Sequence, residues 1–75
     1  MNRRNKYIEY AYHGGPYDRG GADSYYRRTG EPHKWPDGTL KGTKVTEEFL
    51  SDEERQAYWA GFNENEEEGN FKDWG

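Results

Sequence analysis

The sequence predicts a small, mainly helical domain with two helices, at about residues 19–28 and 51–68, joined by a Pro/Gly-rich loop. Three observations support this fold class. The chain has 75 residues, which is enough for one small domain with a single core. Residues 51–68 combine a helix-capping sequence with aromatic residues at helical spacing. Prolines and glycines gather between the two predicted helices, where they favour turns.

The composition predicts a thin core that is aromatic rather than aliphatic. Ile, Leu, Val and Phe together number seven of the 75 residues, well below the ~20% level under which chains are often disordered. Thirteen residues are Phe, Tyr or Trp, and each aromatic side chain buries roughly 150–250 Å². We therefore expect aromatic rings to supply most of the buried surface.

Charge is divided unevenly along the chain, although the formal net charge is only −4. Residues 1–44 contain nine Lys or Arg and five Asp or Glu, a net of +4. Residues 45–75 contain two and ten, a net of −8. This division predicts a fold whose halves neutralise each other, two surfaces for two kinds of partner, or an ordinary solvated surface.

The first helix is predicted at about residues 19–28. Asp18 is the candidate N-cap, because its carboxylate can accept hydrogen bonds from amides of the first turn. Gly30 is the candidate residue that ends the helix. Gly20 and Gly21 each weaken a helix by up to about 1 kcal/mol. Close backbone packing or a bound partner must therefore support this glycine pair.

The second helix is predicted at residues 51–68. Ser51 and Glu54 form a capping box, in which each side chain can bond a free main-chain amide of the other residue. Gly69 suits the left-handed position that ends a helix. Three aromatic side chains share one face of this helix: Tyr58, Trp59 and Phe62. Two small residues at helical spacing leave room for another backbone or ring to approach: Ala57 and Gly61.

The remaining segments complete a single small domain at residues 6–75. Residues 1–5 are expected to be a mobile basic tail. Residues 6–12 predict an extended aromatic segment, because Tyr and Ile alternate with other residues. Residues 31–44 are predicted to be a loop, because they contain prolines and an Asp-Gly turn sequence. Residues 69–75 are expected to form a tail that folds back onto the helices through two aromatic side chains, Phe71 and Trp74.

No pattern in the sequence supports catalysis or a bound cofactor. The chain has no cysteine, which excludes disulfides and thiolate chemistry. Its two histidines, His13 and His33, lack neighbours at metal-ligand spacing, and the glycine pairs do not belong to a phosphate-binding loop. We therefore expect a protein that is not an enzyme and that carries no metal or cofactor. No stretch is apolar enough to predict a membrane span.

Two binding surfaces follow from the charge pattern. One is acidic and would bind a basic site of another protein; its candidate residues are Glu64, Glu67, Glu68, Phe71 and Trp74. The other is basic and aromatic, and suits protein or nucleic acid, since arginine contacts phosphates and rings stack on bases; its candidate residues are Tyr25, Tyr26, Arg27, Arg28 and Trp35. Packing of the two tyrosines against the rings of the second helix is the structural alternative.

Several motifs resemble a family of short tailed-bacteriophage proteins that have no assigned activity. The motifs are Gly14-Gly15-Pro16-Tyr17-Asp18-Arg19-Gly20, Ala22-Asp23-Ser24-Tyr25-Tyr26, Pro32-His33 and Gly69-Asn70-Phe71-Lys72-Asp73-Trp74-Gly75. The resemblance covers most of the chain from His13 onward and implies a bacteriophage protein in the cytoplasm of an infected bacterial host. More loosely, the order of a Tyr/Gly/Arg helix, a loop and the helix containing Ala57-Tyr58-Trp59-Ala60-Gly61-Phe62 is similar to the ribosome modulation factor family. Those two-helix proteins of bacterial ribosomes are strongly basic, whereas this chain is acidic.

These observations together lead to one functional expectation and one alternative. We expect a small, non-enzymatic bacteriophage accessory protein that binds and modulates a host protein through its acidic helix and its Arg/Tyr surface. The alternative is a ribosome- or RNA-associated module that uses the basic aromatic residues Tyr25 to Arg28. No membrane partner is expected.

Overall fold

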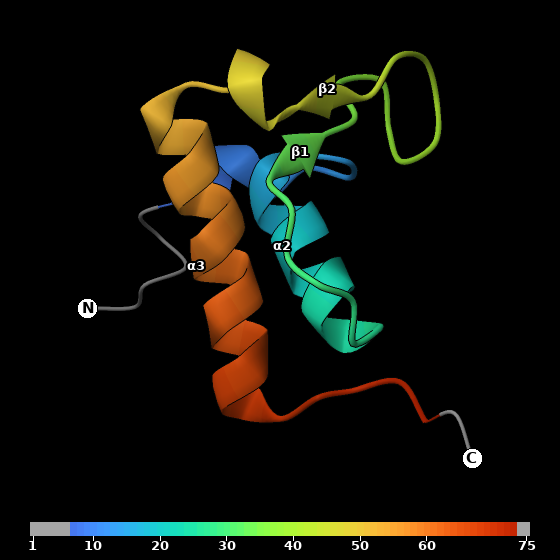
Figure 1. Cartoon of the computed structure of the whole chain (residues 1–75), viewed down its shortest axis with the longest axis vertical. Coiled ribbons are helices and arrows are strands. Elements are labelled where there is room, and N and C mark those ends of the chain that lie inside the picture. The colour runs from blue at the N-terminus through green and yellow to red at the C-terminus, as the bar shows by residue number, and fades with distance from the viewer. Residues whose placement is uncertain (1–6, 74–75) are drawn as a thin grey trace.

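The structure is built on two helices that lie side by side. The computed structural model describes residues 7–73, and within this range two α-helices, α2 (Pro16–Tyr25) and α3 (Asp52–Glu68), pack against each other. Both helices descend through the view of Figure 1, so they run in the same general direction. The predicted fold class, a small and mainly helical domain, is confirmed. The predicted basic tail at 1–5 and the site residue Trp74 lie outside the described residues.

Helix α2 begins earlier than the sequence predicts. Gly15 is the N-cap and Pro16 takes the first helical position, where its fixed φ suits the helix and its missing N–H leaves no bond unmade. Asp18 therefore lies in the first turn and is not the cap. Its Oδ2 accepts a hydrogen bond from the Gly14 N–H at 3.0 Å, and its charge complements the positive end of the helix dipole. The aspartate thus stabilises the turn that leads into the helix.

The end of α2 also differs from the prediction. The helix ends at Tyr25, and Arg27 takes the left-handed conformation that closes it, with a φ of 59°. The N–H groups of Arg27 and Arg28 bond carbonyls of the last turn at 2.9 and 2.8 Å, which is the Schellman pattern. Gly30 does not end the helix. It lies against the Trp59 ring instead, where an added Cβ would stand 2.5 Å from a ring carbon.

The sequence predictions for α3 are confirmed. The Ser51 hydroxyl accepts from the Glu54 N–H at 3.1 Å, and the Glu54 carboxylate accepts from the Ser51 N–H at 2.8 Å, which completes the capping box. Gly69 ends the helix with a φ of 68°. Although α3 has 17 residues, no helix in the described part of the chain is long and apolar enough to cross a membrane.

Glycines at the crossing point let the two helix backbones touch. A Cβ added at Gly20 would stand 1.9 Å from the carbonyl oxygen of Tyr58, and one added at Gly61 would stand 2.2 Å from the carbonyl oxygen of Tyr17. No other residue type fits either position without a shift of the backbone. The prediction that close backbone packing offsets the low helix propensity of glycine is therefore confirmed at Gly20. The gap predicted at Gly61 is occupied by the α2 backbone.

The core is thin and aromatic, as the composition predicted. The buried hydrophobic residues in the described range are Leu50, Ala57 and Tyr58. The rings of Tyr58, Trp59 and Phe62 contact one another, with centroids 5.2 to 6.4 Å apart. Trp59 nevertheless remains 38% exposed. Aliphatic burial alone is therefore small, and polar contacts between elements add to what holds the fold together.

A small sheet interrupts the segment that was predicted to be a loop. Strand β1 (His33–Lys34) pairs in antiparallel register with β2 (Val45–Thr46), so that His33 faces Thr46 and Lys34 faces Val45. A 3-10 turn, η2 (Glu47–Phe49), then leads into α3. Each strand has two residues, which is too short to produce an alternating sequence pattern. The sequence therefore could not indicate this pairing.

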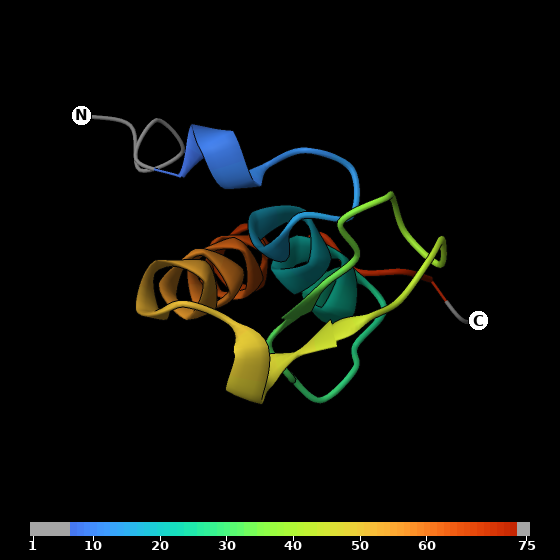
Figure 2. The ribbon, with the colours of Figure 1, turned by 90° about the horizontal axis from the view of Figure 1, so that it is seen from above.

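The N-terminal aromatic segment is a turn, and the prediction of an extended segment is wrong for its described part. Ile8–Tyr10 form a 3-10 helix, η1. Figure 2 shows that this turn and the β1–β2 sheet lie on opposite sides of the helix pair, so no strand is near enough to pair with it. Its amides bond within the turn instead, and Ile8 stays 68% exposed. The Tyr7 ring stacks on that of Tyr17 at 6.2 Å between centroids.

The tail lies against the end of α2 as far as the structure describes it. The Lys72 N–H donates to the carbonyl oxygen of Tyr25 at 2.7 Å. The Arg27 guanidinium lies over the Phe71 ring, 4.5 Å from its centroid. The predicted return of the tail through Phe71 is thus present, and it uses α2 as its support.

Candidate binding groove between the two helices

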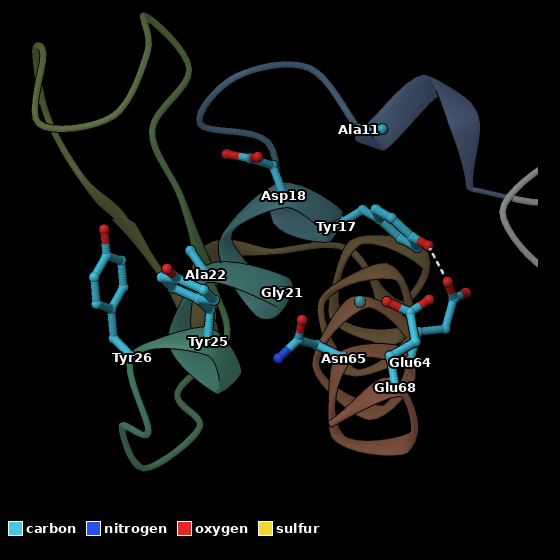
Figure 3. Close-up of a pocket in the computed structure, with 11 residues that line it drawn as sticks. Ala11, Tyr17, Asp18, Gly21, Ala22, Tyr25, Tyr26, Glu64, Asn65 and Glu68 are labelled. Atoms are coloured by element: carbon cyan, nitrogen blue, oxygen red, sulfur yellow. Dashed lines mark hydrogen bonds between the residues drawn. The ribbon is translucent and has the colours of Figure 1, made fainter. Parts of the chain in front are cut away.

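An open groove of about 520 Å³ lies between α2 and α3, and we call it the interhelical groove. Gly21 contributes bare backbone to it, with no side chain to fill the space. Figure 3 shows Tyr17 reaching from α2 to Glu64 of α3, with Tyr26 beyond Tyr25 on the side away from α3. The lining residues are Ala11, Tyr17, Asp18, Gly21, Ala22, Tyr25, Tyr26, Gly61, Glu64, Asn65 and Glu68.

The interhelical groove is acidic. Asp18, Glu64 and Glu68 line it, and none of its lining residues is Lys or Arg. Three carboxylates around one small space raise the local concentration of cations, because the nearby protein has a low dielectric constant and focuses the field. The groove therefore favours a positively charged ligand group.

A hydrogen bond across the groove fixes one of these carboxylates. The Tyr17 hydroxyl donates to Glu64 Oε1 at 2.5 Å (Figure 3). Tyr17 comes from the first turn of α2 and Glu64 from the fourth turn of α3, so the bond joins the two helices. Glu64 is only 8% exposed, and a charge-assisted bond of this kind offsets part of the cost of burying its charge. The carboxylate is held in place before any ligand arrives.

Two tyrosines at the end of α2 provide aromatic surface to the groove. The rings of Tyr25 and Tyr26 meet edge-on, with centroids 5.0 Å apart. Neither hydroxyl forms a hydrogen bond with any residue between 7 and 73. The ring contacts of the described residues do not connect this pair to the aromatic cluster of α3. The predicted packing of these two tyrosines against the rings of α3 is therefore absent. Tyr25 remains available to a ligand, whereas the Arg28 guanidinium already lies over one face of Tyr26.

The candidate site residues do not all lie in one place. Tyr25, Tyr26, Glu64 and Glu68 come together in the interhelical groove. Arg27 packs on Phe71, while Arg28 lies over the Tyr26 ring at 4.9 Å and Trp35 lines a different pocket. Glu67 is exposed on α3 and lines neither of these two pockets. Arg28 thus connects the tyrosine pair to the pocket that Trp35 lines, whereas Arg27 is turned to the tail.

Some groove residues were not predicted from the sequence. These are Tyr17, Asp18 and Asn65. Tyr17 and Asn65 form contacts with positions more than 40 residues away, such as Tyr17 with Glu64. The available signal was the small-residue pattern. Gly21 and Gly61 indicate that the two helix backbones approach each other. Side chains one helical turn away from that contact then border the space between the helices.

A buried hydrogen-bond network lies beneath β1 on another side of α2. Arg19 Nε donates to His33 Nε2 at 3.1 Å, and His33 Nδ1 bonds the carbonyl oxygen of Glu31 at 2.7 Å. Because arginine only donates and a carbonyl only accepts, the imidazole is neutral and carries its hydrogen on Nδ1. Burial lowers the pKa of His33 and outweighs the opposite effects of Glu31 and Asp23.

Asp23 is the charged centre of this network. The Tyr58 hydroxyl donates to its Oδ2 at 2.5 Å, and nitrogens of Arg19 and Arg28 stand 3.7 and 3.6 Å from its Oδ1. Burial, followed by the hydrogen bond to Asp23, raises the pKa of Tyr58, so the phenol stays neutral and donates. The Tyr58 hydroxyl also accepts from the Glu31 N–H at 2.9 Å. One carboxylate thereby links α2, α3 and the segment that leads into β1.

No protein-family model, curated protein or solved structure matches this chain. Among residues 7–73, no three His, Asp or Glu side chains are grouped so that they could hold a metal ion. The chemistry of the interhelical groove therefore carries the functional argument.

Proposed function

We propose that this chain is a small, non-enzymatic binding protein whose interhelical groove accepts a cationic side chain, Lys or Arg, of a partner protein. One observation carries the proposal: the groove combines three carboxylates and three tyrosines with no Lys or Arg. This is the composition that recognises a cation on an aliphatic stem.

The aromatic and acidic groups of the groove would act on different parts of such a side chain. The face of Tyr25, and the face of Tyr26 that Arg28 does not cover, attract a guanidinium or ammonium, which is worth roughly 0.5–2 kcal/mol for each good contact. The carboxylates of Glu64 and Glu68 would bond its N–H groups. Bare backbone at Gly21 would lie beside the aliphatic stem.

The form of the groove favours a segment of a protein over a free metal ion. It is open along the helices, and Glu64 already accepts a hydrogen bond from Tyr17. A hydrated metal ion would not contact the aromatic rings, whereas a basic peptide can contact both the rings and the carboxylates. The sequence resemblance supports a bacteriophage origin, so we propose that the partner is a host protein that this chain modulates.

A peptide titration tests the proposal. The probe is a nine-residue peptide of glycine and arginine, compared with the same peptide in which glutamine replaces every arginine. We expect the arginine peptide to shift the amide NMR signals of Gly21 and Gly61 with a dissociation constant below about 1 mM, and the glutamine peptide to leave them unchanged. Equal shifts with both peptides would exclude recognition of a cation.

Matched variants locate the binding site. Glu68→Gln removes a groove carboxylate and should weaken the arginine peptide several-fold. Tyr25→Leu should weaken it about 2–5-fold through loss of a cation–π contact. Glu48→Gln removes an exposed carboxylate on η2, outside the groove, and should leave the affinity unchanged. If Glu48→Gln weakens binding as much as Glu68→Gln and Tyr25→Leu has no effect, the peptide is attracted by the net acidic charge and not by the groove.

Nuclease treatment separates this function from the RNA-associated alternative. The chain is immobilised, exposed to bacterial lysate and washed, with and without prior ribonuclease digestion. A protein that remains bound after digestion, and that the Glu68→Gln variant does not retain, supports the proposal. A partner that disappears after digestion favours the ribosome- or RNA-associated module.

A further inference from the structure

A second pocket, of about 390 Å³, lies beside β1 and has the opposite character to the interhelical groove. We call it the basic pocket. Arg19 and Asp23 border it from the side of α2 opposite Tyr17 and Tyr25, since residues two positions along a helix point about 160° apart. Its lining residues are Arg19, Asp23, Arg28, Thr29, Glu31, His33, Trp35, Leu40 and Lys44.

Arg19 presents hydrogen-bond donors to the basic pocket that the protein does not use. Its side chain is only 11% exposed, and its Nε is bonded to His33. Its two terminal nitrogens form no hydrogen bond with any residue in the described range, and the one nearer Asp23 stands 3.7 Å away, which is too long for such a bond. Because a guanidinium carries five N–H donors in a fixed fork, the unused ones remain available to an acceptor in the pocket.

Two further cations border the same space. Arg28 is held over the Tyr26 ring, with a nitrogen 3.6 Å from Asp23 Oδ1 and 57% of its side chain exposed. Lys44 is exposed and has no ion pair among residues 7–73. Asp23 and Glu31 supply two negative charges against these three positive ones, and Asp23 is already bonded to Tyr58. The pocket is thus net positive.

Part of the wall of the basic pocket is apolar. Trp35 and Leu40 line it beside the cations. An indole face stacks readily on a planar base. The guanidinium groups of arginine can donate several hydrogen bonds at once to the oxygens of a phosphate. A ligand that carries both a phosphate and a planar ring would use every part of this pocket.

We infer that the basic pocket binds a nucleoside monophosphate unit, with the phosphate between Arg19, Arg28 and Lys44 and the base against Trp35. The unit is either a free nucleotide or a nucleotide within single-stranded RNA, since both present the same groups. The two sites have no lining residue in common, and they touch where Arg28 of this pocket lies over Tyr26 of the interhelical groove.

Calorimetric titration with AMP, adenosine and inorganic phosphate tests the inference on the whole chain. We expect AMP to bind at least tenfold more tightly than adenosine, which lacks the phosphate, and more tightly than phosphate, which lacks the base. Absence of AMP binding at millimolar concentration, or adenosine that binds as well as AMP, would overturn the inference. A five-residue oligoadenylate that binds more tightly than AMP identifies RNA as the source, and equal affinity identifies the free nucleotide.

Substitutions at the edge of the pocket place the phosphate. Arg28→Gln and Lys44→Gln change exposed side chains and should each weaken AMP several-fold. Lys41→Gln is the matched control, because Lys41 is an exposed lysine of the same loop that does not line the pocket. If the three variants lose affinity equally, AMP responds to overall charge and the assigned site is wrong. Circular dichroism of each variant confirms that it is folded before titration.

Discussion

The contact between the helix backbones makes a sharp prediction for Gly20→Ala. In most helices this substitution is stabilising, because alanine has the highest helix propensity and glycine one of the lowest, a difference of about 1 kcal/mol. Here the new Cβ would stand 1.9 Å from the carbonyl oxygen of Tyr58. We therefore expect the opposite sign, a loss of stability.

The size of the loss follows from the distance that the helices must move. Ordinary Cβ contacts begin at 3.4 Å, so the two backbones must separate locally by about 1.5 Å, enough to forfeit much of the dispersion energy of the contacts around the crossing. Overpacking of this kind costs roughly 1–3 kcal/mol. With the propensity gain of about 1 kcal/mol included, we expect a net loss of about 1 kcal/mol and a melting temperature lower by roughly 4–8 °C.

The neighbouring glycine supplies the control. A Cβ at Gly21 would meet its nearest atom, the carbonyl oxygen of Gly61, at 3.8 Å, which is ordinary contact. Gly21→Ala should therefore raise stability by up to about 1 kcal/mol. Urea unfolding followed by circular dichroism measures both variants. If Gly20→Ala is as stable as the unsubstituted chain, or if both variants shift in the same direction, the backbones do not touch at Gly20.

Three further predictions concern other elements. Ser51→Ala should lower the free energy of unfolding by about 1 kcal/mol through loss of the α3 cap; unchanged helical dichroism and urea midpoint would contradict this. Leu40 is 79% exposed and has a φ of 66°, so Leu40→Gly should raise stability by about 0.5–1 kcal/mol, and a lower melting temperature would refute the strain. Burial holds the pKa of His33 below its ordinary value of 6.5, so the unfolded chain takes up the proton first. Stability should therefore fall as pH drops through 6.5, until the folded protein is also protonated, and His33→Gln should flatten this slope between pH 7.5 and 5.5 in urea unfolding.

The sequence predicted α3 well because its signals are local. The capping pair Ser51 and Glu54, three residues apart, and the glycine at 69 each act within one turn of helix, so nothing distant can overrule them. The boundaries of α2 were less accurate for the opposite reason. Pro16 begins the helix where Asp18 seemed the better cap, and Arg27 closes it in a conformation that arginine rarely adopts.

The interhelical groove and the network around Asp23 were harder to predict than the helix boundaries. The negative charge of α3 and the tyrosines of α2 were visible in the sequence, but their meeting in one groove depends on how the helices cross. The charged network around Asp23 was not predicted at all, because Tyr58 and His33 lie 35 and 10 residues away along the chain. Contacts of this kind depend on tertiary packing, which no local pattern encodes.

The paired glycines at the helix crossing also bear on how this protein can evolve. Because neither Gly20 nor Gly61 tolerates a side chain without moving a backbone, selection on folding should keep both unchanged while Gly21 drifts. A relative too divergent for overall similarity would still show two glycines about 41 positions apart, with an acidic residue three positions after the first and a tyrosine three before the second. That spaced pattern, read together with the capping box, offers a way to find distant members of this lineage among unrelated small proteins.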